Sequence, residues 1–257
     1  MTKIVSVHSF RGGTGKSNVT ANVSAQFAQM GKRVGVIDTD IQSPGIHVLF
    51  GMDEENIDKA LNDYLWGRCA IEETAYDVGT KLGEGEVLVM GGGIYLIPSS
   101  IRAGEIARVL REGYDVGLLN DGFRALIDKL HLDYLFIDTH PGLNEETLLS
   151  VAISDVLIII LRPDQQDFQG TAVTVDVSRK LEVPNLYLVV NKALTSYDFE
   201  ALKKRIVDTY DAPVAAILPL SEDVARMQSA DLFSLRYPDH PFSEGIRNIV
   251  AAIEAAS

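Results

Sequence analysis

Short apolar runs rich in valine and isoleucine alternate along the chain with longer segments whose apolar positions recur at helical spacing. Several short runs are apolar at every position, as in the strands of a parallel sheet that helices cover on both faces. The pattern predicts strands at residues 3–7, 34–38, 94–98, 134–138, 156–161, 186–191 and 214–218. It predicts helices at residues 16–30, 57–66, 117–130, 145–153, 168–181, 199–210 and 242–255. This alternation is typical of a doubly wound α/β fold with a mostly parallel sheet and helices on both faces.

One part of the pattern breaks the parallel order. Residues 86–90 are followed by glycines at 91–93 and by the strand at 94–98, which predicts a hairpin. Such a hairpin would add one antiparallel edge strand to the sheet, as in many large mixed sheets. No linker or fixed-period repeat interrupts the chain, so we expect a single domain over residues 1–257.

Composition adds constraints on location and partners. Residues 1–9 lack the features of a signal peptide, and the most apolar run, 156–161, is too short to cross a bilayer, so we expect a cytoplasmic protein. The single cysteine, Cys69, excludes an intrachain disulfide and a CxxC site. With a net charge of −13, nucleic acid would bind only at a local basic patch. The cluster Lys203, Lys204 and Arg205 is interpreted as a solvated helix face.

The first predicted strand runs into Ser9-Phe10-Arg11-Gly12-Gly13-Thr14-Gly15-Lys16-Ser17 and then into a predicted helix. Glycines allow backbone amides to turn inward around phosphate oxygens, and the start of the following helix adds a positive dipole. Lys16 supplies a charge for the β- and γ-phosphates, and the Ser17 hydroxyl can ligate Mg²⁺. The loop is a variant, because Phe10 stands where the standard pattern has glycine.

Acidic residues follow two further strands. One strand ends in Asp38-Thr39-Asp40 and another in Asp138-Thr139-His140-Pro141-Gly142. Ligands of open α/β sheets bind outside the carboxyl ends of the strands, where both motifs would lie. An aspartate in this place can hold Mg²⁺, commonly through water.

Asn191-Lys192 ends a later strand. The Asn191 side chain offers a donor and an acceptor in one plane, which suits an adenine edge. The alternative is that Asn191 caps the next turn, and the sequence leaves both open.

With these motifs in this order, the chain resembles the ParA/MinD family of deviant Walker-box ATPases over nearly its full length. Further similarity lies in Gly31-Lys32-Arg33-Val34 and in Asn191-Lys192 followed by Ile217-Leu218-Pro219-Leu220. The resemblance implies a slow ATPase that forms ATP-dependent homodimers and uses ATP and Mg²⁺. Members of the family position plasmids, chromosomes, division sites, flagella, chemoreceptors or carboxysomes with an adaptor protein that stimulates hydrolysis.

The resemblance also implies roles for individual residues. It places the nucleotide on Arg11, Gly12, Gly13, Thr14, Gly15, Lys16, Ser17 and Asn18, with adenine held by Asn191 and the backbone near Pro219. Ser17, Asp38 and Asp138 would hold the magnesium ion, and Lys16, Asp38, Asp40 and Arg11 would be catalytic, with Asp40 orienting the attacking water.

Position 11 departs from the family, which has a lysine there that reaches the partner's phosphates. Arg11 keeps the charge and gains a planar fork, so it is expected to contact phosphate, like an arginine finger supplied in trans. The alternative is that Arg11 points away and that Lys180, Lys192 or Arg162 crosses the interface instead. The carboxysome-distributing branch also lacks this lysine, which makes that branch a possible place for the chain.

The end of the chain bears on the surface that is bound. Ile246, Ile249, Val250 and Ile253 form one helical stripe that faces a core, so no C-terminal membrane-targeting helix is expected. Nonspecific DNA, and thus the nucleoid, is the expected surface. Two alternatives stay open: an ATP-dependent metabolic ligase with His140 near its substrate, and a nucleotide-gated scaffold with negligible hydrolysis.

Overall fold

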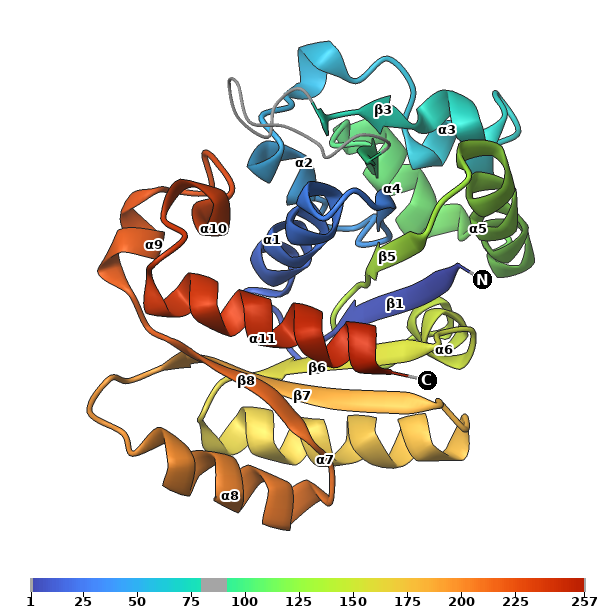
Figure 1. Cartoon of the computed structure of the whole chain (residues 1–257). Coiled ribbons are helices and arrows are strands. Elements are labelled where there is room, and N and C mark those ends of the chain that lie inside the picture. The colour runs from blue at the N-terminus through green and yellow to red at the C-terminus, as the bar shows by residue number, and fades with distance from the viewer. Residues whose placement is uncertain (1, 80–91, 257) are drawn as a thin grey trace.

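In the computed structural model, which describes residues 2–79 and 92–256, eight strands form one sheet in the order β3-β4-β2-β5-β1-β6-β7-β8 (Figure 1). The strands are β1 (Lys3–His8), β2 (Arg33–Asp38), β3 (Tyr76–Asp77), β4 (Gly93–Ile97), β5 (Tyr134–Asp138), β6 (Val156–Leu161), β7 (Asn185–Ala193) and β8 (Val214–Pro219). The short strand β3 pairs antiparallel with β4, and the other neighbouring strands pair in parallel. The predicted mostly parallel sheet with one antiparallel edge strand is therefore confirmed.

Helices cover both faces of the sheet, with α1 and α11 on one face and α7 and α8 on the other (Figure 1). The helices are α1 (Lys16–Gln29), α2 (Ile46–Leu49), α3 (Leu61–Leu65), α4 (Ala103–Glu112), α5 (Val116–Leu130), α6 (Glu145–Ala152), α7 (Gln165–Lys180), α8 (Phe199–Tyr210), α9 (Glu222–Arg226), α10 (Phe233–Arg236) and α11 (Pro241–Ala255). Two short 3₁₀ turns lie at Glu54–Asn56 and Ile71–Thr74. None of these helices combines the length and apolar character that a membrane crossing requires.

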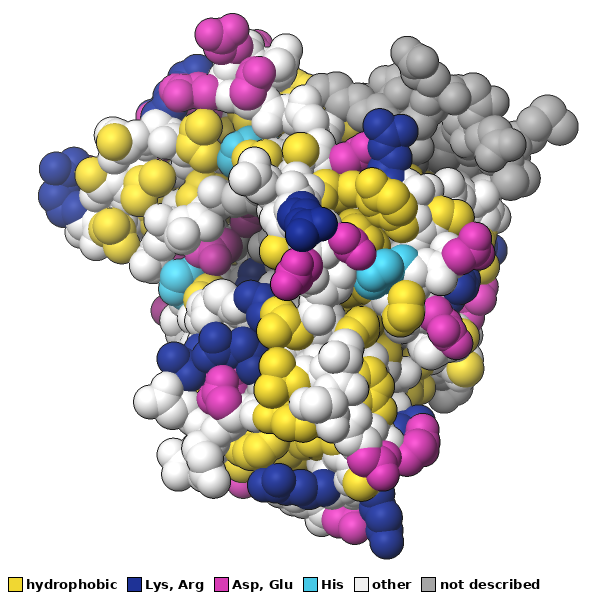
Figure 2. Space-filling model, turned by 90° about the vertical axis from the view of Figure 1, so that its left-hand side faces the viewer, with side chains coloured by type: hydrophobic (Ala, Val, Ile, Leu, Met, Phe, Trp, Pro, Cys, Tyr) yellow, Lys and Arg dark blue, Asp and Glu magenta, His cyan; other side chains and the backbone are white. Residues whose placement is uncertain are grey.

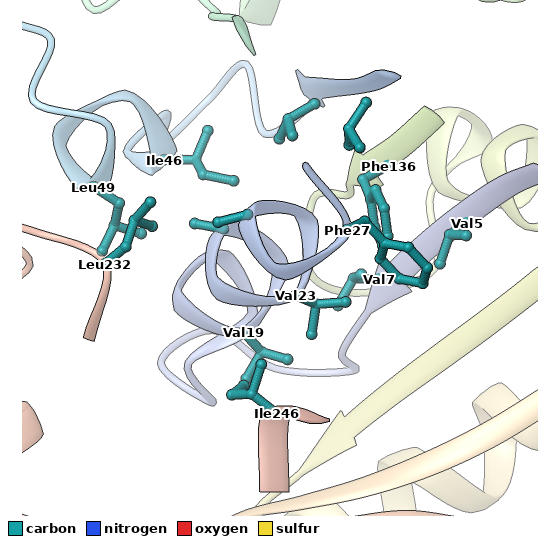
Figure 3. Packing of buried hydrophobic residues seen from close by; sticks show 14 of the residues in the cluster. Val5, Val7, Val19, Val23, Phe27, Ile46, Leu49, Phe136, Leu232 and Ile246 are labelled. Atoms are coloured by element: carbon teal, nitrogen blue, oxygen red, sulfur yellow. The ribbon is translucent and has the colours of Figure 1, made fainter. Parts of the chain in front are cut away.

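The core on one face is built around α1, which packs on the sheet beside α11, while α11 itself packs against β8 (Figure 3). The Phe27 ring lies 4.3 Å from the Tyr134 ring and 5.7 Å from the Phe136 ring, measured between centroids. On its other side, α1 packs against Ile246 of α11. Because apolar contacts hold α1 along its length, they also fix the position of its N-terminus, which lies at the carboxyl edge of the sheet.

The last helix packs as its sequence pattern predicts. Ile246, Ile249 and Ile253 are fully buried, and Val250 is nearly so. Both termini lie at the amino edge of the sheet (Figure 1). There the Lys3 ammonium donates hydrogen bonds to carbonyls of the last turn of α11, where a cation also complements the helix dipole.

One local prediction is wrong in part, and another concerns residues that the structure does not describe. The predicted helix at residues 57–66 is wrong in its first part, because residues 57–60 are not helical and α3 begins at Leu61. The Lys59 amide donates to the Tyr76 hydroxyl instead, and the Ala60 amide donates to the Asp63 carboxylate. Residues 86–91 of the predicted hairpin lie outside the described residues, and the antiparallel partner of β4 that the structure describes is β3.

The packing of Phe27 leads to a prediction about stability. Phe27→Ala should lower the free energy of unfolding by about 3–5 kcal/mol, since it leaves a cavity between α1 and the sheet. Met30, at the end of the same helix, has 44% of its surface exposed, so Met30→Ala should change stability by no more than about 0.5 kcal/mol. Denaturant unfolding measures both values, and equal effects of the two substitutions would contradict this packing.

Candidate functional site

Three strand ends meet at the carboxyl edge of the sheet. Strand pairing places Asp138 of β5 beside Val7 of β1 on one side and beside Asp38 of β2 on the other. The strand order reverses here, because the chain leaves β1 for β2 on one side and later returns to β6 on the other. Open α/β sheets bind ligands at such a switch point. Figure 2 shows this face, on which side chains of both charges lie around a hollow.

The loop between β1 and α1 adopts conformations that suit glycine. Gly13 has a φ of 78° and Gly15 a φ of 92°, both in the left-handed region. Helix α1 begins at Lys16, and no side chain of the described residues caps its first turn. Its first amides and the positive end of its dipole therefore face the loop, an arrangement that binds anions.

A buried ion pair joins this loop to β5. The Lys16 ammonium lies 2.8 Å from Asp138 Oδ1, with 7% of the lysine side chain and 1% of the aspartate side chain exposed. The Thr20 hydroxyl, one turn further along α1, donates to the same oxygen at 3.2 Å. Breaking such a pair by removing one partner is costly, because the other charge is left buried and unpaired.

Asp38 and Asp40 are held by the backbone and by each other. Asp38 Oδ1 accepts the Asp40 amide at 3.0 Å, and Asp38 Oδ2 accepts the Gly45 amide at 3.2 Å. Asp40 Oδ1 lies 2.6 Å from His140 Nδ1. Burial, followed by the negative charge of Asp138, raises the pKa of Asp38 to about 8, while the charge of Lys16 lowers it.

The donor set fits a magnesium ion held together with a polyphosphate. Two buried carboxylates, Asp38 and Asp138, face a single buried ammonium, so an added divalent cation would relieve their repulsion. Asp138 Oδ2 and the Thr14 hydroxyl are buried and, among the residues described, have no hydrogen-bond partner. The described residues hold no group of three or more His, Cys, Asp or Glu side chains that could hold a metal ion. Mg²⁺ is commonly held by one or two protein oxygens together with substrate phosphates and water, and the buried Asp138 Oδ2 offers such an oxygen.

His8 lies directly beneath the loop and was missed by the sequence reasoning. It is fully buried at the end of β1, and its Nδ1 lies 2.8 Å from the Thr139 hydroxyl. Burial and the positive charge of Lys16 lower the pKa of His8 to about 3, so the ring is neutral. Thr20 was missed as well, although its position four residues after Lys16 places both side chains on one face of α1.

The two unusual loop residues, Phe10 and Arg11, both contact α7. The Phe10 ring lies so close to Gly170 that a Cβ on the glycine would stand 2.0 Å from a ring carbon. The Arg11 guanidinium lies 3.3 Å from the buried Asp167 carboxylate and 3.8 Å from that of Asp164. The phosphate contact expected of Arg11 stays a prediction, and in the single chain its partners are these carboxylates.

The end of β7 contacts the loop between β1 and α1, and a pocket lies beside the ends of β7 and β8. Asn191 donates to the Thr14 carbonyl at 2.8 Å, and Lys192 donates to the Gly13 carbonyl at 2.8 Å. Beside the ends of these strands lies a pocket of about 300 Å³, lined by Thr195, Tyr197, Phe199, Pro219, Leu220, Ser221, His240 and Pro241. The structure thus brings together the predicted residues of the loop, Asp38, Asp40, Asp138 and Asn191, and places Pro219 in the pocket wall.

Comparison with known proteins gives a family match. The family model of the AAA domain matches residues 2–196 of this chain. An uncharacterised ATP-binding protein of Methanocaldococcus jannaschii is 25% identical over 257 residues, which are all of this chain and 89% of that protein.

Two further similarities differ in what they show. An iron-sulfur cluster carrier protein of Methanococcus maripaludis is 29% identical over 201 residues, which are 74% of this chain but only 61% of the carrier. The solved structure of the septum site-determining protein MinD of Pyrococcus horikoshii with Mg-ADP superposes with a TM-score of 0.80. It is 20% identical, covers 99% of this chain and 97% of its own, and so shows that the two share a fold.

The contact between Phe10 and Gly170 predicts the sign of a substitution. Glycine inside a helix is less favourable than alanine by about 1 kcal/mol, so propensity alone would make Gly170→Ala stabilising. We expect the opposite, a loss of about 1–3 kcal/mol, because the new methyl group would overlap Phe10. In a Phe10→Ala background the loss should be clearly smaller, because the ring carbons are gone and only the Phe10 Cβ, 2.8 Å from the new methyl group, remains. Denaturant unfolding of the four proteins gives the coupling, and equal effects in both backgrounds would contradict the contact.

Proposed function

The chain belongs to the AAA domain family of P-loop ATPases, and on that premise we propose that it couples ATP binding to dimerisation in order to position an intracellular cargo. Its fold is that of the ParA/MinD ATPases, and it is an ATPase that uses ATP and Mg²⁺. The cargo proposed is a plasmid, a chromosome or a protein organelle such as the carboxysome, moved through nonspecific DNA binding and an adaptor protein.

One observation supports the catalytic part most strongly. Lys16, Asp138 and Asp38 converge from three elements beneath a loop whose amides and helix dipole favour an anion. We propose that Lys16 shares its charge between Asp138 and the β- and γ-phosphates once a triphosphate occupies the loop. Residues 11–18 would then surround the phosphates, and the pocket beside Pro219 would take the adenine.

The acidic residues would hold the metal ion and orient the attacking water. Ser17 and Asp38 would hold the metal, with Asp138 contributing through water, and Mg²⁺ when bound neutralises charge on the phosphates. Asp40 would orient the attacking water, and its hydrogen bond with His140 fixes the carboxylate for that role. His140 is therefore interpreted as a residue that positions Asp40 rather than as part of a separate substrate site.

A second function deserves a test because of Arg11. Its ion pairs with Asp164 and Asp167 occupy the guanidinium that would otherwise reach a partner's phosphates. If those pairs persist in the dimer, the protein would act as a nucleotide-gated scaffold with negligible hydrolysis. Phosphate release by the wild type and by Arg11→Ala separates the two functions: a large loss in the variant supports catalysis by Arg11.

Dimerisation is the first test of the proposed function. Asp40→Ala should slow hydrolysis and hold the ATP-bound state. Size-exclusion chromatography with light scattering should then give the mass of one chain, 28.1 kDa, in ADP and twice that mass in MgATP. A single-chain mass under both conditions would contradict the proposal.

The surface that is bound can be tested with DNA of unrelated sequence. Because the chain carries a net charge of −13, binding must come from a local patch that the dimer completes, so retention should require ATP and fall steeply with salt. A gel-shift or filter assay with ATP and with ADP measures this. Absence of retention at low salt with ATP would remove DNA from the proposal while leaving the ATPase cycle in place.

A further inference from the structure

The side chains of two consecutive residues of β7 donate hydrogen bonds to two consecutive carbonyls of the loop between β1 and α1. The Asn191 amide nitrogen donates to the Thr14 carbonyl, and the Lys192 ammonium donates to the Gly13 carbonyl, both at 2.8 Å. Asn191 has only 5% of its surface exposed, and its own Oδ1 accepts the Lys192 amide at 2.8 Å. Both ends of the Asn191 side chain are thus engaged by the backbone.

A bulge in β7 creates this arrangement. Val190 pairs with Ile217 of β8 and Ala193 pairs with Pro219, so three steps along β7 match two steps along β8. The extra residue releases Asn191 and Lys192 from the ladder, and Lys192 adopts a φ of 57°, in the left-handed region. Bulges re-aim side chains near functional sites, and backbone strain of this kind persists only where neighbouring contacts hold it.

A glycine in the loop leaves the space that the Asn191 side chain occupies. A Cβ on Gly15 would lie 2.4 Å from the Asn191 amide nitrogen, so only glycine leaves room for Asn191 to reach the Thr14 carbonyl. The loop and the bulge therefore fit each other by sequence, although 177 positions separate Thr14 from Asn191.

The geometry has a direct consequence for phosphate binding. In a trans peptide unit the carbonyl and the amide of the next residue point in opposite directions. With the carbonyls of Gly13 and Thr14 drawn towards β7, the amides of Thr14 and Gly15 point to the other side. We infer that Asn191 and Lys192 are positioning residues that orient these two amides towards the triphosphate, a role that rests on the proposed function.

This role differs from reading the adenine base, which the family resemblance suggested for Asn191. A residue that orients the loop supports every ligand that carries the phosphates, whatever its base. A residue that reads the base affects the choice between adenine and guanine and leaves a bare polyphosphate untouched. The two roles are therefore separable by the ligands used.

The decisive variant is Lys192→Met, because it keeps the aliphatic stem on an exposed residue and removes only the ammonium group. Calorimetry with Mg²⁺ and ATP, GTP or inorganic tripolyphosphate should show about three- to tenfold weaker binding of all three ligands, with the ATP-to-GTP ratio unchanged. Lys192→Arg, which retains a donor, should recover part of the affinity. Asn191→Leu should act in the same direction, and Lys204→Met, at an exposed lysine of α8, serves as the matched control.

The outcomes are distinct. Unchanged tripolyphosphate binding together with a lost preference for ATP would assign the pair to the base and overturn the inference. Unchanged binding of all three ligands by Lys192→Met would also overturn it while the proposed function stands. Failure of the folded wild type to bind any of them with Mg²⁺ would instead overturn the proposed function itself.

Discussion

The buried ion pair between Lys16 and Asp138 is the interaction on which the rest of the site depends. It joins the start of α1 to the end of β5, and strand pairing places Asp38 directly beside it. A lysine buried in this way needs its carboxylate, so the loop, the helix and both acidic strand ends must be assembled together. The same charges suit a metal and a polyphosphate, because two carboxylates share one ammonium.

Much of the fold could be predicted from the sequence because its signals are local. The runs at β5 and β6 are apolar throughout and were predicted with their true bounds, and α8 begins and ends where its pattern predicts. The start of α3 was not predictable in this way, because Ala60 and Lys59 are held by Asp63 and by the distant Tyr76. Helix α4 was missed, although Ile106, Val109 and Leu110 recur at helical spacing, and among its residues only Val109 is buried.

The residues of the site also fall into those that a local sequence signal identifies and those that only contacts between distant segments bring together. Lys16, Asp38 and Asp138 could be found because each follows an apolar strand or a glycine-rich turn, and these signals lie within a few residues. The contacts of Phe10 with Gly170 and of Lys192 with Gly13 join positions far apart in the chain, and one of them depends on a strand bulge. No spacing in a single sequence encodes such contacts.

The similarity to the iron-sulfur cluster carrier covers 61% of the carrier's length, and these 257 residues contain one cysteine, so we do not propose that the protein carries an iron-sulfur cluster.

The account rests on a triphosphate and a magnesium ion occupying the loop between β1 and α1. A crystal structure of the wild-type protein with Mg²⁺ and a non-hydrolysable ATP analogue tests this most directly. The phosphates should lie among residues 11–17, with the Lys16 ammonium hydrogen-bonded to them, the Ser17 hydroxyl on the metal and the base in the pocket beside Pro219. Nucleotide density elsewhere on the molecule, with Lys16 still bound only to Asp138, would contradict the account.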